Sequence, residues 1–477
     1  MQKQLETKSH ALVVDLDGTL IKTDMLFETL ILFMKKKPWA LLMIPIWLFG
    51  GMEKLKERLA QEVIPDPTLI PYHEEVVNWC RAQAAAGVPV YLATGTNIRV
   101  AESMAQHLGF FCGVIASDGF VNRVGAAKLS SIEETLKNAP FTYAGDCSTD
   151  LPIWASAAGA VTVGVSASLR NKVAQHTKLE QVFEVPSTGI KTLTKAIRVH
   201  QWVKNLLVFV PLFTAHKFSL PIFATACIAF AAFCLISSSV YVLNDLLDLE
   251  ADRAHPRKSQ RPFASGRLSI FSGLVLLPLL VLGALALSLL LPTAFRMILL
   301  TYLAVTLAYS FYLKPRVLID VLTLASLFTL RIFAGAFALN VVLSEWLLAF
   351  SVFIFLSLAF VKRYAELDNL KRRGLQMPPG RAYRVEDADQ LATFGVTSGY
   401  MAVLVLALYM NSPKVAALYN NSELLWLMCP TMIYWTSRIW LAARRGEMNE
   451  DPIIFAFKDK ASYAVGFIML AVVLAAI

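Results

Sequence analysis

Apolar residues follow two different patterns along this chain. Up to about residue 190 the apolar runs are short and alternate with polar residues, as in the strands and amphipathic helices of an α/β domain. Nine long apolar segments follow, centred near residues 208, 232, 280, 302, 330, 353, 401, 432 and 468. A helix that crosses a bilayer needs about 20 mostly apolar residues. The pattern therefore predicts a doubly wound α/β domain at 1–187, followed by an all-α polytopic membrane domain of about nine helices at 188–477.

Composition supports a membrane protein. Hydrophobic residues make up 56% of the chain and charged residues 17%, and the mean hydropathy is +0.55. Soluble domains carry about 25% charged residues, so an ordinary soluble enzyme, a coiled coil and a disordered chain are excluded. The six cysteines are scattered without a CxxC pair, which predicts neither disulfides nor a zinc site. The net charge of +9 fits basic membrane loops better than nucleic-acid binding.

The distribution of basic residues predicts an orientation. The first ten residues are polar and acids interrupt the apolar run after them, so we expect no secretory signal and a cytoplasmic N-terminal domain. With nine spans, eighteen Lys and Arg residues lie in loops on the side of that domain, and three, Lys217, Arg296 and Lys414, lie opposite. By the positive-inside rule, this asymmetry predicts an inner (cytoplasmic) membrane protein with its active sites on the cytoplasmic side.

Polar motifs in the N-terminal domain stand beside apolar, strand-like runs. Ala11–Val14 is followed by DLDGTL, Val88–Ala93 by TGT, and Phe141–Ala144 by GDCSTD, while a lysine lies in a loop between the last two. Parallel strands deliver such groups to one edge of a sheet, although any one acid there is more often a helix cap. The candidate site residues are Asp15, Asp17, Thr94, Lys128, Asp146 and Asp150.

The order DxDGT, Thr, Lys, GDxxxD resembles the haloacid dehalogenase superfamily of aspartyl-phosphate phosphatases. The resemblance implies that Asp15 is the nucleophile and Asp17 the general acid/base. It also implies that Thr94 and Lys128 hold the phosphoryl oxygens. These residue types suit the reaction, because an attacking carboxylate needs its charge and that of the phosphate neutralised, and a neighbouring acid must protonate the leaving alcohol.

The same resemblance implies a magnesium site. Asp15 and Asp146 would bind Mg²⁺, supported by Asp150. The alternative is a degenerate, inactive domain, which the intact aspartates and lysine disfavour.

The segment between the first two motifs, about residues 21–87, is where this superfamily places a cap. It contains three consecutive lysines, Lys35–Lys37, followed by the uncharged run Pro38–Gly51. That run is too short to span a bilayer, and basic residues beside a Trp-rich apolar run are typical of an interfacial segment. A buried cap helix is an equally good interpretation. An interfacial segment would make a lipid phosphate the phosphatase substrate.

An acidic motif, NDLLDLEAD, ends the second apolar segment. On a helix, Asp245, Asp248 and Asp252 are spaced i, i+3, i+7 and share one face, with Asn244 beside them. Three like charges on one face repel unless a cation lies between them, which disfavours a merely solvated helix end. Clustered carboxylates suit Mg²⁺ held jointly with phosphate oxygens, and the basic residues that follow would bind the remaining charge.

This motif in a nine-helix body resembles the UbiA superfamily of intramembrane prenyltransferases, from about Arg198 to the C-terminus. The resemblance implies a diphosphate donor bound through Mg²⁺ and aspartates, whose organic group is transferred to an acceptor in the bilayer. The three motif aspartates are then the metal ligands.

A departure from that pattern narrows the resemblance. Prenyl-transferring members carry a second aspartate-rich motif. In this chain the corresponding stretch is residues 360–368, which has only one of the acids in place and two added bases. With residues 198–205 and 451–459, this stretch resembles the decaprenyl-phosphate phosphoribosyltransferases, which move 5-phosphoribose from phosphoribosyl diphosphate (PRPP) to a polyprenyl phosphate. Extra bases suit so anionic a donor. The substrate-binding candidates are Lys204, Asn244, Arg257, Lys258, Arg261, Lys362, Arg363, Glu366 and Asp459.

Two ionisable residues lie deeper in the predicted membrane domain. Asp320 and Arg331 are eleven residues apart, on one face of a helix. Ionisable groups at membrane depth are commonly functional, and a structural ion pair is the alternative.

Three hypotheses follow for the whole chain. The first is a bifunctional enzyme with Mg²⁺ in both domains, which makes a polyprenyl phosphoribosyl lipid from PRPP and removes its 5-phosphate. The second is a prenyltransferase acting from a prenyl diphosphate on a 4-hydroxybenzoate-like aromatic acceptor, fused to a phosphatase of separate substrate. The third is a non-catalytic anchor that positions the head. The expected partners are the bilayer and these lipids, with no nucleic acid, and the oligomeric state stays open.

Overall fold

The computed structural model describes residues 10–186, 188–215, 219–372, 374, 381–413, 415, 419–448 and 451–476. The chain divides into two compact units, residues 1–197 with 242–276, and residues 198–241 with 277–477. The segment 242–276, which carries the NDLLDLEAD motif, therefore groups with the N-terminal unit. The boundary predicted at 187/188 would instead place residues 242–276 in the membrane domain. The domain boundaries stay a prediction.

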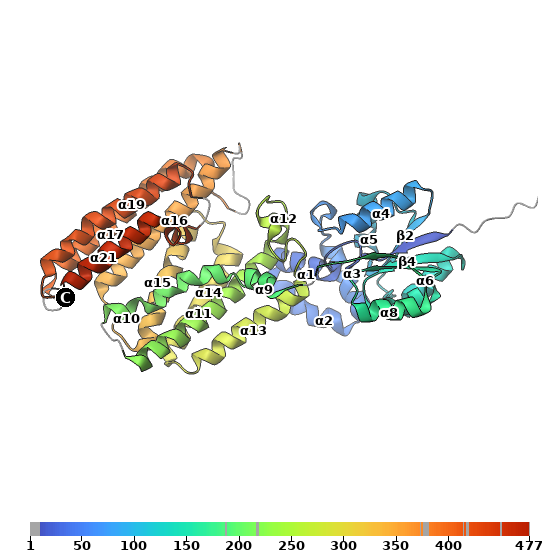
Figure 1. The fold of residues 1–477 in the computed structure, drawn as a ribbon, viewed down its shortest axis with the longest axis horizontal. Coiled ribbons are helices and arrows are strands. Elements are labelled where there is room, and N and C mark those ends of the chain that lie inside the picture. Colours follow the sequence, from blue (N-terminus) through green and yellow to red (C-terminus); the bar gives the residue numbers. More distant parts are fainter. Residues whose placement is uncertain are drawn as a thin grey trace, which may run out of the picture. The chain divides into compact units, whose positions relative to one another are not determined.

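A parallel six-stranded sheet forms the centre of the N-terminal unit (Figure 1). Its strands are β1 (Ala11–Val14), β2 (Val90–Asn97), β3 (Gly113–Ser117), β4 (Phe141–Gly145), β5 (Gly159–Val163) and β6 (Leu179–Phe183). They are ordered β3-β2-β1-β4-β5-β6, so the winding reverses between β1 and β4. Ligands of open α/β sheets bind at the carboxyl ends of the strands at such a reversal.

Helices cover both faces of this sheet. Leu12 and Val14 of β1 belong to the core under α4 and α5, whereas Ala11 and Val13 belong to the core under α6, α7 and α8. This alternation follows from the period of two along a strand. The helices are α4 (Glu74–Ala85), α5 (Ile98–Leu108), α6 (Ala126–Leu136), α7 (Leu151–Ser156) and α8 (Ala167–His176), and a short α9 (Ile190–Ala196) follows. The predicted parallel α/β architecture is confirmed.

A smaller helical layer follows β1. It consists of α1 (Met25–Lys36), the 3₁₀ turn η1 (Pro38–Leu42), α2 (Met43–Phe49) and α3 (Met52–Glu62). Phe33, Leu55 and Leu59 lie in a core of its own. Because α4 packs on the sheet instead, this separate layer is shorter than the predicted cap at 21–87.

Within the same unit, α1 packs against the segment 242–276. The carboxylate of Glu28 accepts hydrogen bonds from Nη2 and Nη1 of Arg253 at 2.6 and 3.0 Å, and both side chains are buried. Arg253 ends α12 (Leu249–Arg253). The rings of Phe27 and Phe271 lie 5.5 Å apart. The NDLLDLEAD segment and the α/β domain thus share part of one interior.

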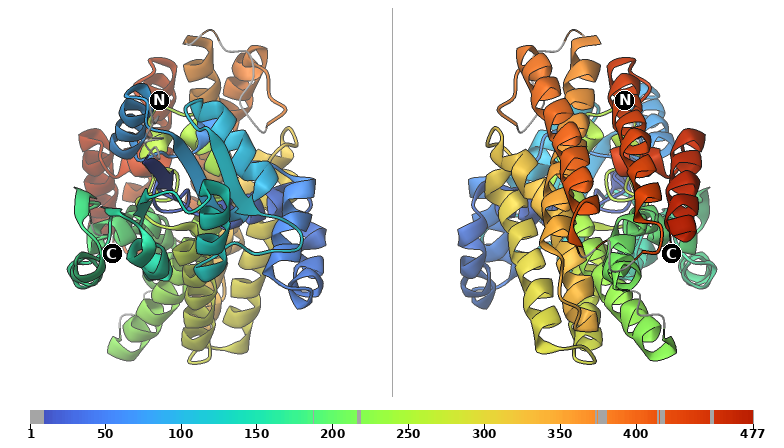
Figure 2. Two further views of the ribbon diagram at one scale, coloured as in Figure 1. Left: turned by 90° about the vertical axis from the view of Figure 1, so that its right-hand side faces the viewer. Right: turned by 90° about the vertical axis from the view of Figure 1, so that its left-hand side faces the viewer.

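Six helices of the described chain are long and apolar enough to cross a membrane. They are α11 (Leu220–Leu247), α13 (Ile270–Ser288), α14 (Thr293–Ala308, continued by a π turn to Leu313), α15 (Ile319–Leu339), α16 (Glu345–Arg372) and α17 (Ala388–Met410). The other three predicted segments form shorter helices: η4 (Val199–Phe209) with α10 (Val210–Thr214), α19 (Met428–Arg444) and α21 (Lys460–Ala476). Helices α17, α19 and α21 run alongside one another (Figure 2). The number of spans stays a prediction.

Several bases of the predicted loops lie elsewhere. Lys362 and Arg363 lie inside α16 rather than in a loop, because that helix continues to Arg372. Lys217 and Lys414 lie outside the described residues. The orientation across the membrane therefore stays a prediction.

Candidate functional site

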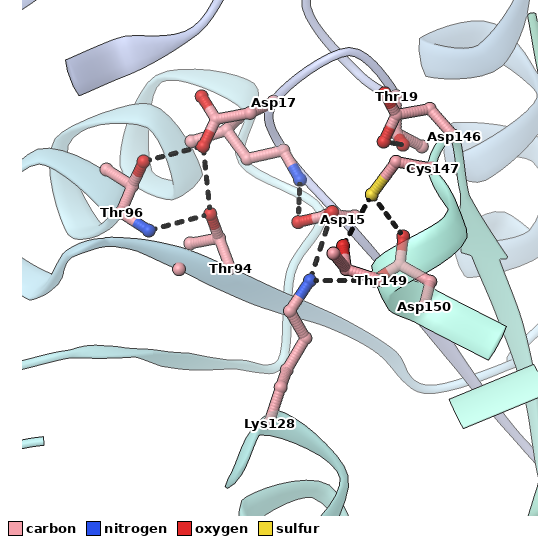
Figure 3. Close-up of polar contacts among 12 residues, drawn as sticks. Asp15, Asp17, Thr19, Thr94, Thr96, Lys128, Asp146, Cys147, Thr149 and Asp150 are labelled. Carbon is pink, nitrogen blue, oxygen red and sulfur yellow. Dashed lines mark hydrogen bonds and ion pairs between the residues drawn. The ribbon is translucent and has the colours of Figure 1, made fainter. Parts of the chain in front are cut away.

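The end of β1 presents Asp15 to a buried lysine (Figure 3). The Asp15 backbone N–H donates to the carbonyl of Ala144 on β4 at 3.0 Å, which continues the ladder one residue past the strand. Its Oδ2 lies 3.0 Å from Nζ of Lys128, and its Oδ1 accepts the N–H of Leu16 at 2.8 Å. Both carboxylate oxygens are thus fixed.

Lys128 joins two acids that are distant in sequence. It lies in the first turn of α6 and is 3% exposed. Its ammonium lies 3.3 Å from Oδ1 of Asp150 and donates to the hydroxyl of Tyr143 at 3.0 Å, which in turn donates to Asp150 at 3.0 Å. Tyr143 was not among the predicted residues, because in the sequence it is an ordinary residue of an apolar, strand-like run.

Asp17 has a separate set of donors. Its Oδ1 accepts the N–H of Met25 at 2.8 Å, at the start of α1. Its Oδ2 accepts the hydroxyl of Thr96 at 2.7 Å and, more weakly, that of Thr94 at 3.4 Å. The sequence singled out Thr94 and missed Thr96, although both belong to the same TGT motif, which the structure places in the last residues of β2. Donors on both oxygens fix the side chain of Asp17.

The loop after β4 brings Asp146 to the same edge of the sheet. Gly18 has a φ of +73°, and a Cβ there would lie 2.1 Å from Oδ2 of Asp146, so only glycine permits this approach. In the described part of the chain, one group of at least three His, Cys, Asp or Glu has ligand atoms within 4.8 Å of one another, namely Asp146, Cys147 and Asp150. Carboxylate oxygens suit Mg²⁺, whereas a thiol suits softer metals.

The electrostatics of this edge favour a bound cation. Burial raises the pKa of Asp15 to about 7, although Lys128 lowers it. Burial also raises the pKa of Asp17 to about 6 and that of Asp146 to about 8, where neighbouring acids add to the effect. Burial lowers the pKa of Lys128, but the carboxylates outweigh it and raise that pKa above its usual range. One lysine does not neutralise these acids, so the donor set fits a divalent cation.

The acidic motif of residues 244–252 forms a second cluster. Helix α11 ends at Leu247, but helical hydrogen bonds continue from Asp248 to Asn244 at 2.9 Å and from Asp252 to Asp248 at 2.8 Å. Asp245 and Asp252 are buried and both contact Nη1 of Arg261, at 3.1 and 2.6 Å.

The shared guanidinium supports a common face for two of the three predicted metal ligands, Asp245 and Asp252. It also corrects the argument from repulsion, because Arg261 supplies a positive charge between them. Asp248 is partly buried, and the three acids do not form a group within 4.8 Å among the described residues. Arg257 and Lys258 lie exposed in the following turn. The metal role of these acids is therefore a proposal.

In the other unit, two predicted lysines converge on one acid. Nζ of Lys204 and Nζ of Lys362 lie 2.7 and 3.1 Å from the same Oδ2 of Asp451. Burial alone would raise the pKa of Asp451, but the two ammonium groups hold it well below its usual range. Asp451 was not predicted as a site residue. The predicted Asp459 instead pairs with Arg438 at 2.8 Å, so it is bound at the start of α21.

Arg363 and Glu366 belong to a buried charge cluster. Arg363 is fully buried, with Nε 2.9 Å from Oδ2 of Asp320. Its guanidinium and that of Arg381 both bond Glu366, while the hydroxyl of Tyr383 donates to Asp320. These mutual pairings satisfy much of the charge that was predicted to bind substrate.

Asp320 and Arg331 have different partners. Arg331 donates to Asn205 at 2.9 Å and to the hydroxyl of Tyr302 at 2.8 Å. Asp320 forms a buried ion pair with Arg363. The structure therefore gives Asp320 the contact expected for a structural ion pair, whereas Arg331 is held by hydrogen bonds.

These features define a class of protein: a helical, multi-pass membrane protein with an additional parallel α/β unit. Residues 206–474 match the model of the UbiA prenyltransferase family, so the chain belongs to that family.

Three relatives extend the comparison. The chain is 38% identical over 461 residues to the uncharacterized protein y4nM of Sinorhizobium fredii, covering 95% of this chain and 89% of that one. It is 37% identical to the nodulation protein NoeC of Azorhizobium caulinodans, covering 57% of this chain and 88% of that one. It is 38% identical to the decaprenyl-phosphate phosphoribosyltransferase of Mycolicibacterium smegmatis, covering 40% of this chain and 62% of that one. The last match spans less than two thirds of that enzyme.

Proposed function

We propose that the chain is a bifunctional membrane enzyme. Its UbiA-type domain transfers 5-phosphoribose from PRPP to a polyprenyl phosphate, and its α/β domain is a phosphatase of the haloacid dehalogenase type that removes the 5-phosphate of that lipid. Both sites face the cytoplasm at the inner membrane. The observation that carries the proposal is the buried Lys128, whose ammonium joins the carboxylates of Asp15 and Asp150 at the end of β1.

In the phosphatase reaction, an oxygen of Asp15 forms a bond to phosphorus while the bond from phosphorus to the ester oxygen breaks. Asp17 gives its proton to the leaving alcohol, which suits a carboxyl whose pKa lies near 6. Asp17 then takes a proton from water as the water releases inorganic phosphate from Asp15. Lys128 stabilises the charge on the phosphoryl oxygens.

Magnesium fits the phosphatase site. Asp15, Asp146 and Asp150 would hold it, since their oxygens are the hard ligands that Mg²⁺ prefers. When bound, it supplies positive charge against the phosphoryl group.

In the transferase reaction, diphosphate leaves the anomeric carbon of ribose and an oxygen of the polyprenyl phosphate bonds to that carbon. Asp245, Asp248 and Asp252 would hold Mg²⁺, because carboxylates in this spacing suit a cation shared with diphosphate oxygens. Arg261 would orient the donor. Similarity to the mycobacterial phosphoribosyltransferase supports PRPP as the donor. The predicted substrate-binding bases Lys204 and Lys362 also support it, since PRPP is more anionic than a prenyl diphosphate.

The second candidate is transfer of a prenyl group to an aromatic acceptor. The family to which the chain belongs is described as prenyltransferases, which favours it. Two incubations separate the candidates. Purified protein and Mg²⁺ receive PRPP with polyprenyl phosphate in one tube, and prenyl diphosphate with 4-hydroxybenzoate in the other. We expect lipid-linked ribose in the first. Prenylated benzoate in the second, without lipid-linked ribose in the first, would overturn the proposal.

A further inference from the structure

The short segment after α1 has an apolar face that no described residue of its unit covers. The side chains of Trp39, Leu42, Ile46 and Phe49 are 72%, 81%, 60% and 92% exposed. Their spacing places them along one stripe of the η1–α2 turn and helix. In a water-exposed helix this stripe is normally polar.

The opposite stripe of the same segment is in use. Ala40 is buried in the core of the small helical layer, and Ile44 and Trp47 pack against that core. The rings of Trp47 and Phe33 lie 5.4 Å apart. The segment is therefore held in place by one face, and its exposed apolar face is not a consequence of local unfolding.

Contacts inside the N-terminal unit place this segment near the end of a membrane span. Helix α1 runs directly into η1, and Ile31 and Leu32 of α1 line a cleft together with Leu246 and Leu247. Those two leucines end α11, which is long and apolar enough to cross a bilayer.

A second span contributes to the same placement. Phe27 lies 5.5 Å, ring to ring, from Phe271 in the first turn of α13. The end of a membrane-spanning helix lies near the level at which the bilayer gives way to water, so α11 and α13, as spans, would place α1 at that level. Since α2 begins a few residues after α1 ends, the chain cannot carry it far from that level.

The charges beside the segment match a lipid surface. Lys35 and Lys36 are exposed at the end of α1, and Lys54 is exposed just after α2. Basic residues flanking an apolar stripe that contains Trp and Phe are the signature of a helix lying in a bilayer interface, where anionic headgroups meet the bases.

We propose that residues 38–49, η1 and α2, lie in the interface of the bilayer with Trp39, Leu42, Ile46 and Phe49 among the lipids. The segment is an element of membrane attachment additional to the spans. Because α1 starts beside Asp17, with its Met25 N–H on that carboxylate, one helix connects the site to this anchor.

The anchor also has a consequence that rests on the proposed function. Helix α1 has 12 residues, which is about 18 Å of helix. A phosphomonoester on a lipid headgroup would then be presented close to Asp15 without leaving the membrane.

The placement is tested in the full-length chain without reference to activity. A fluorescent amino acid with environment-sensitive emission replaces Phe49 in one variant and Glu134, exposed on α6, in a control. Each is reconstituted in nanodiscs of phosphatidylcholine and phosphatidylglycerol, with and without doxyl-labelled lipid. We expect blue-shifted emission and strong quenching by doxyl lipid at position 49, and neither at position 134.

Two outcomes would overturn the placement. Water-like, unquenched emission at position 49 would mean that the stripe faces solvent. Blue-shifted emission that doxyl lipid does not quench would mean that protein covers it, such as a second copy of this chain.

A triple variant, Leu42→Ser, Ile46→Ser and Phe49→Ser, tests the consequence. These side chains take no part in the core, so the fold is expected to persist, and Phe120→Ser, at a 93% exposed position, is the matched control. We expect the KM for a lipid phosphomonoester to rise about tenfold in the triple variant, with hydrolysis of a small soluble phosphomonoester unchanged. An equal KM for the lipid would overturn the role in substrate access. If the unmodified chain hydrolyses neither substrate, the proposed phosphatase function fails, and quenching still decides the placement.

Discussion

Two clusters of aspartates in this chain are assembled in different ways. In the first, Asp15 and Asp146 directly follow the adjacent strands β1 and β4, between which the winding of the sheet reverses. Asp150 lies in the 3₁₀ turn after β4, and Lys128 reaches Asp15 and Asp150 from a helix. In the second, the acids of residues 245–252 come from consecutive helical turns at the end of α11.

The difference lies in what holds the charges together. In the first cluster, burial raises the pKa values of Asp15 and Asp146, and the neighbouring acids add to the effect. In the second cluster, Arg261 lies between Asp245 and Asp252 and already balances part of their charge. These contacts suit the roles proposed above, with the first cluster as the catalytic centre of the phosphatase. In the second cluster, binding of an anionic substrate would require Arg261 to exchange one of its aspartate partners.

The largest expected effect is on the nucleophile. Asp15→Asn should lower phosphatase activity by about three orders of magnitude or more, because an amide does not attack phosphorus. Transferase activity should be unchanged, and the lipid product should accumulate with its 5-phosphate. Phosphate release and mass spectrometry of the lipid measure both. Glu134→Gln, exposed on α6, is the matched control. Equal lipid products from Asp15→Asn and the unmodified chain would mean that the phosphatase acts on something else.

The second prediction concerns the other cluster, where a substitution should affect the transferase and spare the phosphatase. Asp245→Asn should lower transferase activity roughly 100-fold through loss of a metal ligand, while hydrolysis of a soluble phosphomonoester persists. Raising the Mg²⁺ concentration should restore part of the transferase rate. A parallel loss of both activities would show that the two clusters are not independent.

The third prediction concerns stability. Lys128→Met leaves the carboxylates of Asp15 and Asp150 buried without their ammonium, and removal of one partner of a buried pair costs about 3–5 kcal/mol. Thermal unfolding and hydrogen exchange in β1 and β4 measure it. The double variant Asp15→Asn/Lys128→Met should regain part of the loss. A single variant as stable as the unmodified chain would contradict the role of Lys128 as the centre of the site.

The fourth prediction tests a link between the clusters. Glu28→Gln leaves Arg253 buried opposite a neutral amide, which should lower the free energy of unfolding by about 1–3 kcal/mol. Both activities should fall modestly, since α1 starts at the donor to Asp17 and Arg253 follows Asp252. Glu184→Gln is the control, because its pair with Arg170 is exposed, and such pairs contribute about 0–1 kcal/mol. An effect of Glu28→Gln no larger than that of Glu184→Gln would contradict the link.

The two clusters also differ in how far sequence could predict them. Strand ends meet at one edge of a parallel sheet whatever lies between them, so the first cluster follows from short motifs. Tyr143 and Thr96 were missed because a tyrosine and a threonine within strands give no distinct signal. Residue spacing along a helix predicts a shared face, as for Asp245 and Asp252, but not which residue of another segment will face it.

The helical unit shows this limit most clearly. Asp320 pairs with Arg363 rather than with Arg331, because the partner is chosen by packing between helices. Asp451 and Asp459 stand in one sequence motif, yet only the first meets Lys204. Asp451 caps α20 (Pro452–Ala456) and Asp459 precedes α21, so the bend between these helices separates them.

The smallest expected effect defines the chemistry of the first cluster. Sγ of Cys147 lies within 4.8 Å of a carboxylate oxygen of Asp146 and of Asp150. The thiol donates to Oδ2 of Asp150 at 3.5 Å. If the site holds Mg²⁺ through oxygen, Cys147→Ser should change phosphatase activity by no more than about twofold, whereas Asp146→Asn should abolish it. Activity measured with Mg²⁺, Mn²⁺ and Zn²⁺ should keep the same order in the serine variant. A large loss, or a shift in metal preference, would make Cys147 a ligand, and the cluster would then select a softer metal than the aspartates of residues 245–252.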